Sequence, residues 1–142
     1  MLYGPIAFFL ILLTTVAAAQ PADQPSLQQQ LRDKRDRRRV LLIYSRTAGK
    51  LADQLRRLES ARADLSERDL DLLPLDAATL PAADRQWLTK TYRLRPDTMF
   101  RAWLIGKDGG VKETYTEPVA PNQLAGLIDT MPMRRQEMRR NQ

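Results

Sequence analysis

The sequence predicts an α/β domain in which a mixed four-stranded sheet is flanked by helices, in the order strand, helix, strand, helix, strand, strand, helix. Three observations carry this prediction. A continuous apolar run spans residues 40–44, a strand-turn-strand pattern spans 100–115, and apolar residues recur at helical spacing in 51–58 and 124–131. With the right-handed crossover of parallel βαβ units, the first half forms a parallel pair and the second half adds a hairpin.

The first core strand is expected at residues 40–44, because five consecutive apolar residues suit a strand that is covered on both faces. A helix is predicted over 50–60, where Leu51, Leu55 and Leu58 share one face. A strand that leads directly into a helix is the beginning of a βα unit.

A second strand is expected at residues 70–75, after a polar connection at 65–69. Pro74 lacks the N–H group that a central strand needs, which favours an edge position for this strand. Pro81 is typical of a first helical turn, and the helix that it opens should run to about Leu94.

The hairpin is the most clearly specified segment. Residues 100–105 show the period-two pattern of a strand, in which Phe100, Ala102 and Leu104 alternate with Arg101, Trp103 and Ile105. Asp108 to Gly110 tolerate the positive φ that a tight turn needs before a return strand at 111–115. A phosphate loop would lead into a helix, so we interpret the glycines as turn residues. Trp103 is expected to lie buried under a helix.

The last predicted helix covers residues 124–131, with apolar residues spaced i, i+3, i+4 and i+7. Pro132 interrupts it, and the basic, methionine-bearing segment 133–140 could add a further turn or two of helix. The predicted domain spans 39–140.

The composition limits the chemistry. The 142 residues suffice for one domain, and 23 Lys and Arg against 17 Asp and Glu give a net charge of +6. This excess fits an anionic partner as well as an ordinary solvated surface. Cysteine and histidine are absent, which excludes thiol nucleophiles, disulfides and the usual zinc ligands. Without an Asp-x-Asp-x-Asp-Gly loop we expect no metal, and we predict no catalytic residues and no cofactor.

Residues 1–19 resemble a signal peptide, with an apolar run over 6–16 and three alanines before an expected cleavage near Ala19 and Gln20. The predicted location is periplasmic or secreted. No Lys or Arg precedes the apolar run, so an uncleaved anchor is the alternative, and it is the only membrane contact that we expect.

Residues 20–38 are predicted to be a flexible spacer that ends in a basic run. That run could hold nucleic acid or anionic lipid, or it could be a solvated lead-in to the domain. Export argues against nucleic acid, so no nucleic-acid partner is expected.

The order of elements and the Lys-Asp-Gly turn within residues 104–112 resemble the thioredoxin fold. More specifically, the tripeptide at 68–70, the hairpin segment 104–112 and the segment 128–138 resemble the family called domain of unknown function 4174. The resemblance implies a thioredoxin-like domain of exported bacterial proteins, related to modules of animal extracellular matrix and sushi-repeat proteins. The family brings no established catalytic residues with it.

Redox thioredoxins carry a Cys-x-x-Cys motif where the first strand gives way to the first helix. The corresponding residues 46–50 contain no thiol. Thiol-disulfide exchange and thiol peroxidase chemistry both need a thiolate, so the sequence excludes these activities.

The candidate partner-binding residues combine forked or flexible cations with carboxylates near the hairpin and the C-terminus. They are Arg68, Asp69, Lys107, Asp108, Lys112, Arg134, Arg135 and Glu137. In the segment 131–140, arginines and methionines together suit a protein or polyanion surface. The alternative is that Met131 and Met133 fill the core end of the last helix while Glu137 pairs with a neighbouring arginine.

Three hypotheses follow for the function. The first is an exported, non-redox module that binds an unknown protein or anionic ligand. The second is an enzyme with a non-thiol site built from Arg68, Asp69, Lys107 and Asp108. The third is a binder of anionic surfaces that uses the arginine runs at both ends of the domain.

Overall fold

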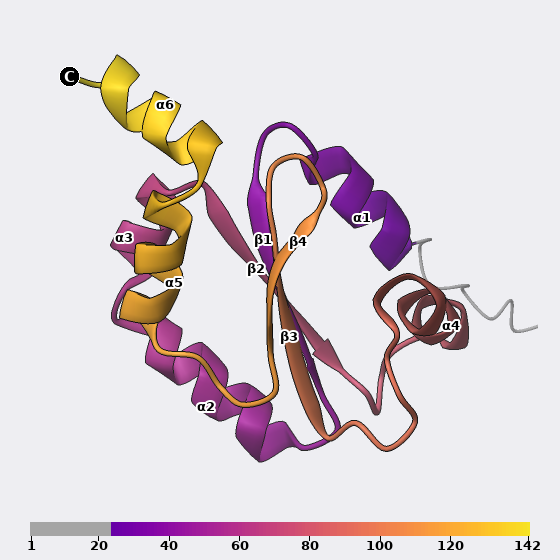
Figure 1. Ribbon diagram of the computed structural model, residues 1–142. Helices are drawn as coiled ribbons and strands as arrows, with labels where there is room; N and C mark the ends of the chain where they lie inside the picture. The colour runs from indigo at the N-terminus through magenta and orange to yellow at the C-terminus, as the bar shows by residue number, and fades with distance from the viewer. Residues whose placement is uncertain (1–23) are drawn as a thin grey trace, which may run out of the picture.

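The computed structural model describes residues 24–142 (Figure 1), and the predicted signal peptide 1–19 with its cleavage site lies outside them. The elements follow one another along the chain as α1 (Leu27–Lys34), β1 (Arg39–Ser45), α2 (Ala48–Glu59), α3 (Arg62–Glu67), β2 (Leu70–Asp76), α4 (Ala82–Tyr92), β3 (Phe100–Ile105), β4 (Val111–Tyr115), α5 (Pro121–Asp129) and α6 (Pro132–Arg140). Within residues 24–142, no helix has both the length and the apolar character needed to cross a membrane.

The four strands form one mixed sheet in the order β2-β1-β3-β4. Strand β1 runs parallel to β2 and antiparallel to β3, and β3 and β4 form the hairpin. This confirms the predicted fold class. Pro74 of β2 lies opposite Ile43 of β1, and β2 is an edge strand, as its proline predicts.

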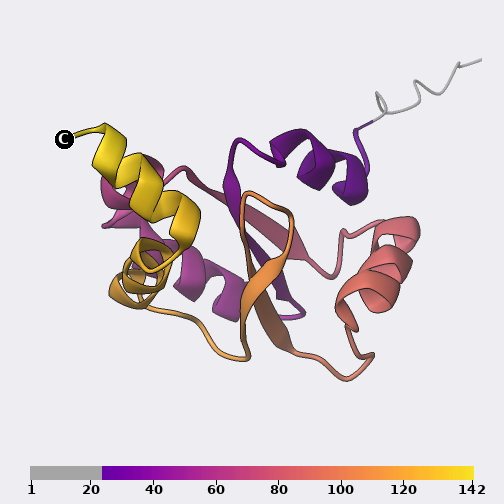
Figure 2. The same ribbon diagram turned by 45° about the horizontal axis from the view of Figure 1, so that its top comes forward.

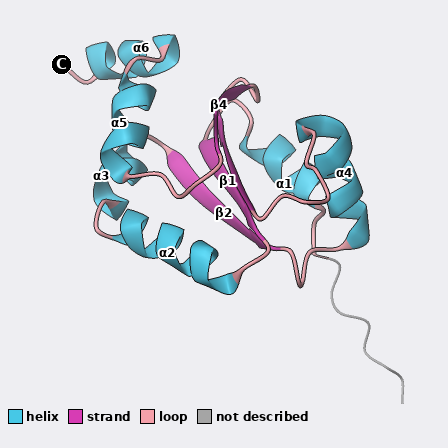
Figure 3. Ribbon diagram, turned by 60° about the horizontal axis from the view of Figure 1, so that its bottom comes forward, coloured by secondary structure: helices cyan, strands magenta, loops and turns pink. Residues whose placement is uncertain are grey.

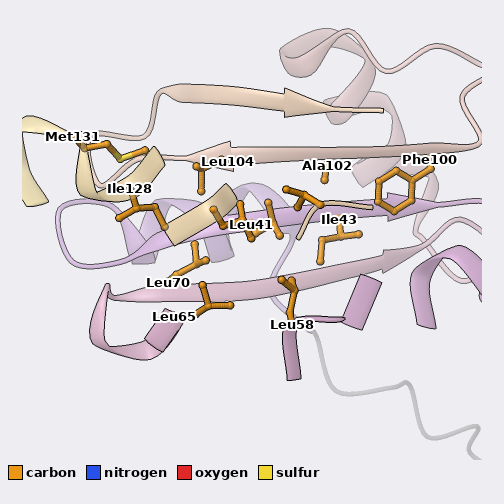
Figure 4. Packing of buried hydrophobic residues seen from close by; sticks show 12 residues of the cluster. Leu41, Ile43, Leu58, Leu65, Leu70, Phe100, Ala102, Leu104, Ile128 and Met131 are labelled. Carbon is orange, nitrogen blue, oxygen red and sulfur yellow. The ribbon is translucent and has the colours of Figure 1, made fainter. Parts of the chain in front are cut away.

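Helices cover both faces of the sheet (Figure 3). Leu41, Ile43 and Leu104 point to the face under α2, α3 and α5 (Figure 4), whereas Leu42 and Trp103 point to the face under α1 and α4. Every residue of β1 is buried, as expected for a strand that packs on two sides. Burial of Trp103 is confirmed, and its ring packs against Tyr92 with centroids 5.5 Å apart.

The spacer prediction for 20–38 was wrong where helix α1 forms. The side chain of Ser26 caps this helix by accepting a hydrogen bond from the amide of Gln29 at 3.2 Å. Leu27 is buried beside α4, and its amide donates to the Asp84 carboxylate at 3.1 Å. Because its anchor lies on α4, far along the chain, the segment is folded rather than flexible.

The polar connection predicted at 65–69 was wrong as well, because α3 includes Leu65 and Leu65 is buried in the core. The predicted extension beyond Pro132 forms the complete helix α6. In the hairpin, Gly109 has a φ of +83°, which is the conformation that the turn requires of a glycine.

Candidate functional site

An ion-pair cluster occupies one edge of the sheet. Parallel strands β1 and β2 begin there, antiparallel β3 ends there, and α6 packs beside them (Figure 2). We define this ion-pair cluster by its eleven charged residues, which are Lys34, Arg38, Arg39, Glu67, Arg68, Asp69, Asp71, Lys107, Asp129, Arg134 and Glu137. Six cations and five carboxylates make the cluster almost neutral.

Arg39 lies at the centre of the cluster and is only 1% exposed. Its guanidinium donates to both carboxylate oxygens of Glu137, at 3.2 and 3.1 Å, and to the backbone carbonyl of Arg68 at 2.8 Å. Such a bidentate pair offsets part of the large cost of removing a charge from water. The buried end of β1 therefore depends on α6 for its counter-ion.

Lys107 joins the hairpin turn to the same carboxylate. Its ammonium group donates to Glu137 at 2.7 Å and to Asp69 at 2.8 Å. Burial by itself raises the pKa of Glu137, but the hydrogen bonds from Lys107 and Arg39 outweigh it and hold that pKa below its usual range. Glu137 is therefore ionised at neutral pH.

A second group of contacts fastens α6 to α3 and α5. Arg68 donates to both carboxylate oxygens of Asp129 at 2.9 Å, and these bonds lower the pKa of Asp129. Arg134, which is 4% exposed, donates to the Glu67 carboxylate at 2.8 Å and to the Glu67 carbonyl at 3.2 Å. The same guanidinium also reaches Asp129 at 3.4 Å.

The outer rim of the cluster is more open to water. Arg38 bridges Asp71, at 2.6 and 3.0 Å, and Asp69, at 3.1 Å, and Lys34 reaches Asp71 at 2.6 Å. Burial raises the pKa of Asp71, yet the hydrogen bonds from Arg38 and Lys34 outweigh it, so the net effect lowers this pKa. The rim thus ties α1 to the beginning of β2.

The structure brings five of the eight predicted partner-binding residues into the ion-pair cluster. Each of these five residues forms an ion pair with another residue of the fold; they are Arg68, Asp69, Lys107, Arg134 and Glu137. Their arrangement supports a structural contribution, since a ligand would have to displace internal partners.

The other three predicted residues lie apart from the cluster. Lys112 donates to Asp108 at 2.7 Å on the exposed side of the hairpin, and this bond together with the amide of Gly110 lowers the pKa of Asp108. Arg135 is exposed on α6. The eight residues therefore do not form one site.

Some residues of segment 131–140 fit the structural interpretation, and others fit the interpretation as a binding surface. Met131 packs in the core, and Glu137 pairs with Arg39, as the structural alternative predicts. Met133 does not plug the core, because 41% of it is exposed. The segment is therefore both an anchor and an outward surface.

Arg39 was not among the predicted site residues, because in the sequence it ends the basic run at the domain boundary. A signal was available. Side chains alternate along a strand, so Arg39 shares a face with Leu41 and Ile43, and that face is the one under the helices. Within residues 24–142, no group of three or more acidic side chains is arranged to hold a metal ion.

The comparisons with known proteins agree with this architecture. A family model described as domain of unknown function (DUF4174) matches residues 30–137. The chain belongs to this family. The match runs from within α1 to Glu137, so it includes the charged residues of the ion-pair cluster. No curated protein matches this DUF4174 chain.

Peroxiredoxins are among the solved structures similar to this DUF4174 domain. The reduced 2-Cys peroxiredoxin of Plasmodium vivax is 17% identical, with 75% of this chain and 72% of that chain covered and a TM-score of 0.56. Thioredoxin peroxidase I of Plasmodium yoelii is also 17% identical, with 75% and 79% covered and a TM-score of 0.55. At such identities the likeness establishes the thioredoxin-like fold. The chain contains no cysteine, so it lacks the thiolate of thiol-based redox chemistry.

Proposed function

We propose that this DUF4174 domain is an exported, non-redox module that binds a protein partner through the outward face of α6. The observation that carries the proposal is the way α6 is held. Its inward residues Arg134 and Glu137 are fixed by ion pairs to α3, β1 and the hairpin turn. The helix is thereby presented in one orientation, and its opposite side is left to solvent.

The outward face of α6 is strongly basic. Arg135 and Arg139 are one helical turn apart and exposed, and Arg140 and Met133 flank them. Within residues 24–142 these three arginines make no ion pair, in contrast to Arg134 on the inward face. Figure 2 shows α6 at the rim of the fold, next to the C-terminus.

The chemistry of this face indicates the kind of partner. Guanidinium groups form paired hydrogen bonds with carboxylates, and a methionine adapts its shape to an apolar contact. The partner that fits is an acidic protein segment with an apolar side chain beside its carboxylates. Export, which rests on the pattern of residues 1–19, would place this interaction in the periplasm or outside the cell.

An acid–base enzyme receives less support from the same geometry. Asp69 and Asp108, the carboxylates of that hypothesis, accept hydrogen bonds from different lysines, Lys107 and Lys112. The lowered pKa of Asp108 also makes it a weak base. We therefore retain binding as the proposed activity.

The test is affinity capture from a native envelope extract, with washes through a salt series. The bait is compared with an Arg135→Gln/Arg139→Gln variant and with Arg56→Gln/Arg62→Gln, which removes the same charge from exposed positions on α2 and α3. We expect one protein to resist high salt and to be lost only with the α6 variant. A mixture of anionic material that elutes together from all three baits would instead support the anionic-surface hypothesis.

A further inference from the structure

A pocket of about 440 Å³ lies at the end of the sheet opposite the ion-pair cluster. It is formed by the end of β1, the loop after β2, helix α4 and the loop before β3. This volume falls within the range of small-molecule sites. Three arginines line it, Arg46, Arg85 and Arg95, and the lining contains no carboxylate.

The position of the pocket follows from the topology. Parallel strands β1 and β2 both end there, and the chain then turns to opposite faces, since α2 packs on one side of the sheet and α4 on the other (Figure 3). The crevice outside the carboxyl ends of two such strands is where open α/β sheets bind ligands.

Two of the arginines are oriented by the backbone. An N–H group of Arg46 donates a hydrogen bond to the carbonyl of Pro96 at 2.9 Å, and one of Arg85 donates to the carbonyl of Ala77 at 2.7 Å. Neither makes an ion pair within residues 24–142, although most arginines of the opposite end do. Their remaining N–H groups are available to an acceptor that the fold does not supply.

The third arginine, Arg95, lies between the pocket and a neighbouring hollow. Arg95 contacts Asp97 at 3.2 Å at the exposed rim. It also lines a neighbouring hollow of about 330 Å³, where Lys50 and Arg101 lie together with the carboxylates of Asp97 and Glu117. The Nε of Arg101 is buried and has no hydrogen-bond acceptor in the part of the chain that the structure describes. A buried donor without a partner is costly, so the Nε of Arg101 lacks an acceptor that a bound anion could supply in this hollow.

We propose that this crevice binds a small anion through its carboxylate or phosphate group, held by Arg46, Arg85 and Arg95. The lining of the pocket also includes the buried residues Tyr44 and Leu94, so a ligand would meet apolar surface as well as the guanidinium groups. A planar guanidinium suits either oxyanion, because both accept paired hydrogen bonds. The site is separate from the outward face of α6 and does not depend on it.

The experiment is a calorimetric titration of the full chain with inorganic phosphate and with succinate, each against chloride at equal ionic strength. The two probes decide between the phosphate and carboxylate classes. Arg46→Gln/Arg85→Gln should weaken binding of the preferred probe by about tenfold or more, which corresponds to about 1.4 kcal/mol. Arg135→Gln/Arg139→Gln removes the same charge from α6 and should leave the affinity within about twofold.

Arg95→Gln tests binding without disturbing the fold, since the contacts of Arg95 with Asp97 are exposed. We expect this single variant to weaken binding while its thermal unfolding stays unchanged. In amide spectra of the full chain, the preferred probe should shift the signals of Arg46, Ala77 and Ala78. The proposal is overturned if neither probe saturates, or if the crevice and α6 variants lose affinity equally.

Discussion

Replacing Glu137 by glutamine tests the ion-pair cluster most directly. The carboxylate accepts three hydrogen bonds from two cations, and Arg39, its main partner, is 1% exposed. Removing one member of a buried pair costs about 3–5 kcal/mol, because the other charge stays buried without compensation. The Glu137 side chain is 17% exposed and glutamine keeps one acceptor, so we expect the free energy of unfolding to fall by about 2–3 kcal/mol.

A double-mutant cycle separates the interaction between Arg39 and Glu137 from a general loss of contacts. Arg39→Met combined with Glu137→Leu replaces the pair by apolar groups, and such exchanges are often neutral or stabilising. We therefore expect the double variant to be more stable than either single variant. If the two single effects simply add, Arg39 does not depend on Glu137 and the cluster has been misinterpreted.

The assay is urea unfolding followed by the fluorescence of the two tryptophans, Trp87 and the buried Trp103. For a domain of this size, the expected loss corresponds to a fall in Tm of about 8–12 °C. Glu117→Gln is the matched control, since this carboxylate pairs with Lys50 but is 70% exposed and should change stability by less than about 0.5 kcal/mol. Equal effects of Glu137→Gln and Glu117→Gln would refute the reasoning.

Three further predictions use the same urea assay. The pKa values of Glu137 and Asp129 are lowered in the folded state, so their stabilisation is complete above the unfolded values near 4 and is lost as pH falls through the folded values. Glu137→Gln should flatten that acid dependence, and an unchanged acid profile would contradict it. Gly109→Ala should cost about 1 kcal/mol because its φ is +83°, whereas Gly49→Ala, in α2 with open space around it, should be neutral or stabilising by up to about 1 kcal/mol. Leu104→Ala in the core should cost about 2–5 kcal/mol, and a loss under about 1 kcal/mol would mean that the site collapses around the smaller side chain.

Local periodicity was enough to predict the sheet. Three patterns were each local, extending over about a dozen residues or fewer. They are the apolar run in β1, the turn residues of the β3–β4 hairpin and the leucine spacing of α2. Pro74 marked an edge strand for an equally local reason, because proline lacks an N–H group. Helices α1 and α3 escaped prediction because each is short and is stabilised by a leucine that packs against distant elements.

The sequence by itself determined the fold class and excluded thiol chemistry, since strand and helix periods and the absence of cysteine can be read one segment at a time. Only the tertiary structure decided which charged side chains form ion pairs inside the fold and which face outward. Arg39 and Glu137 are 98 residues apart in the chain, and they meet because β1 begins at the edge of the sheet where α6 packs. The arginines of the crevice likewise come from three separate segments, which meet where the parallel strands β1 and β2 end.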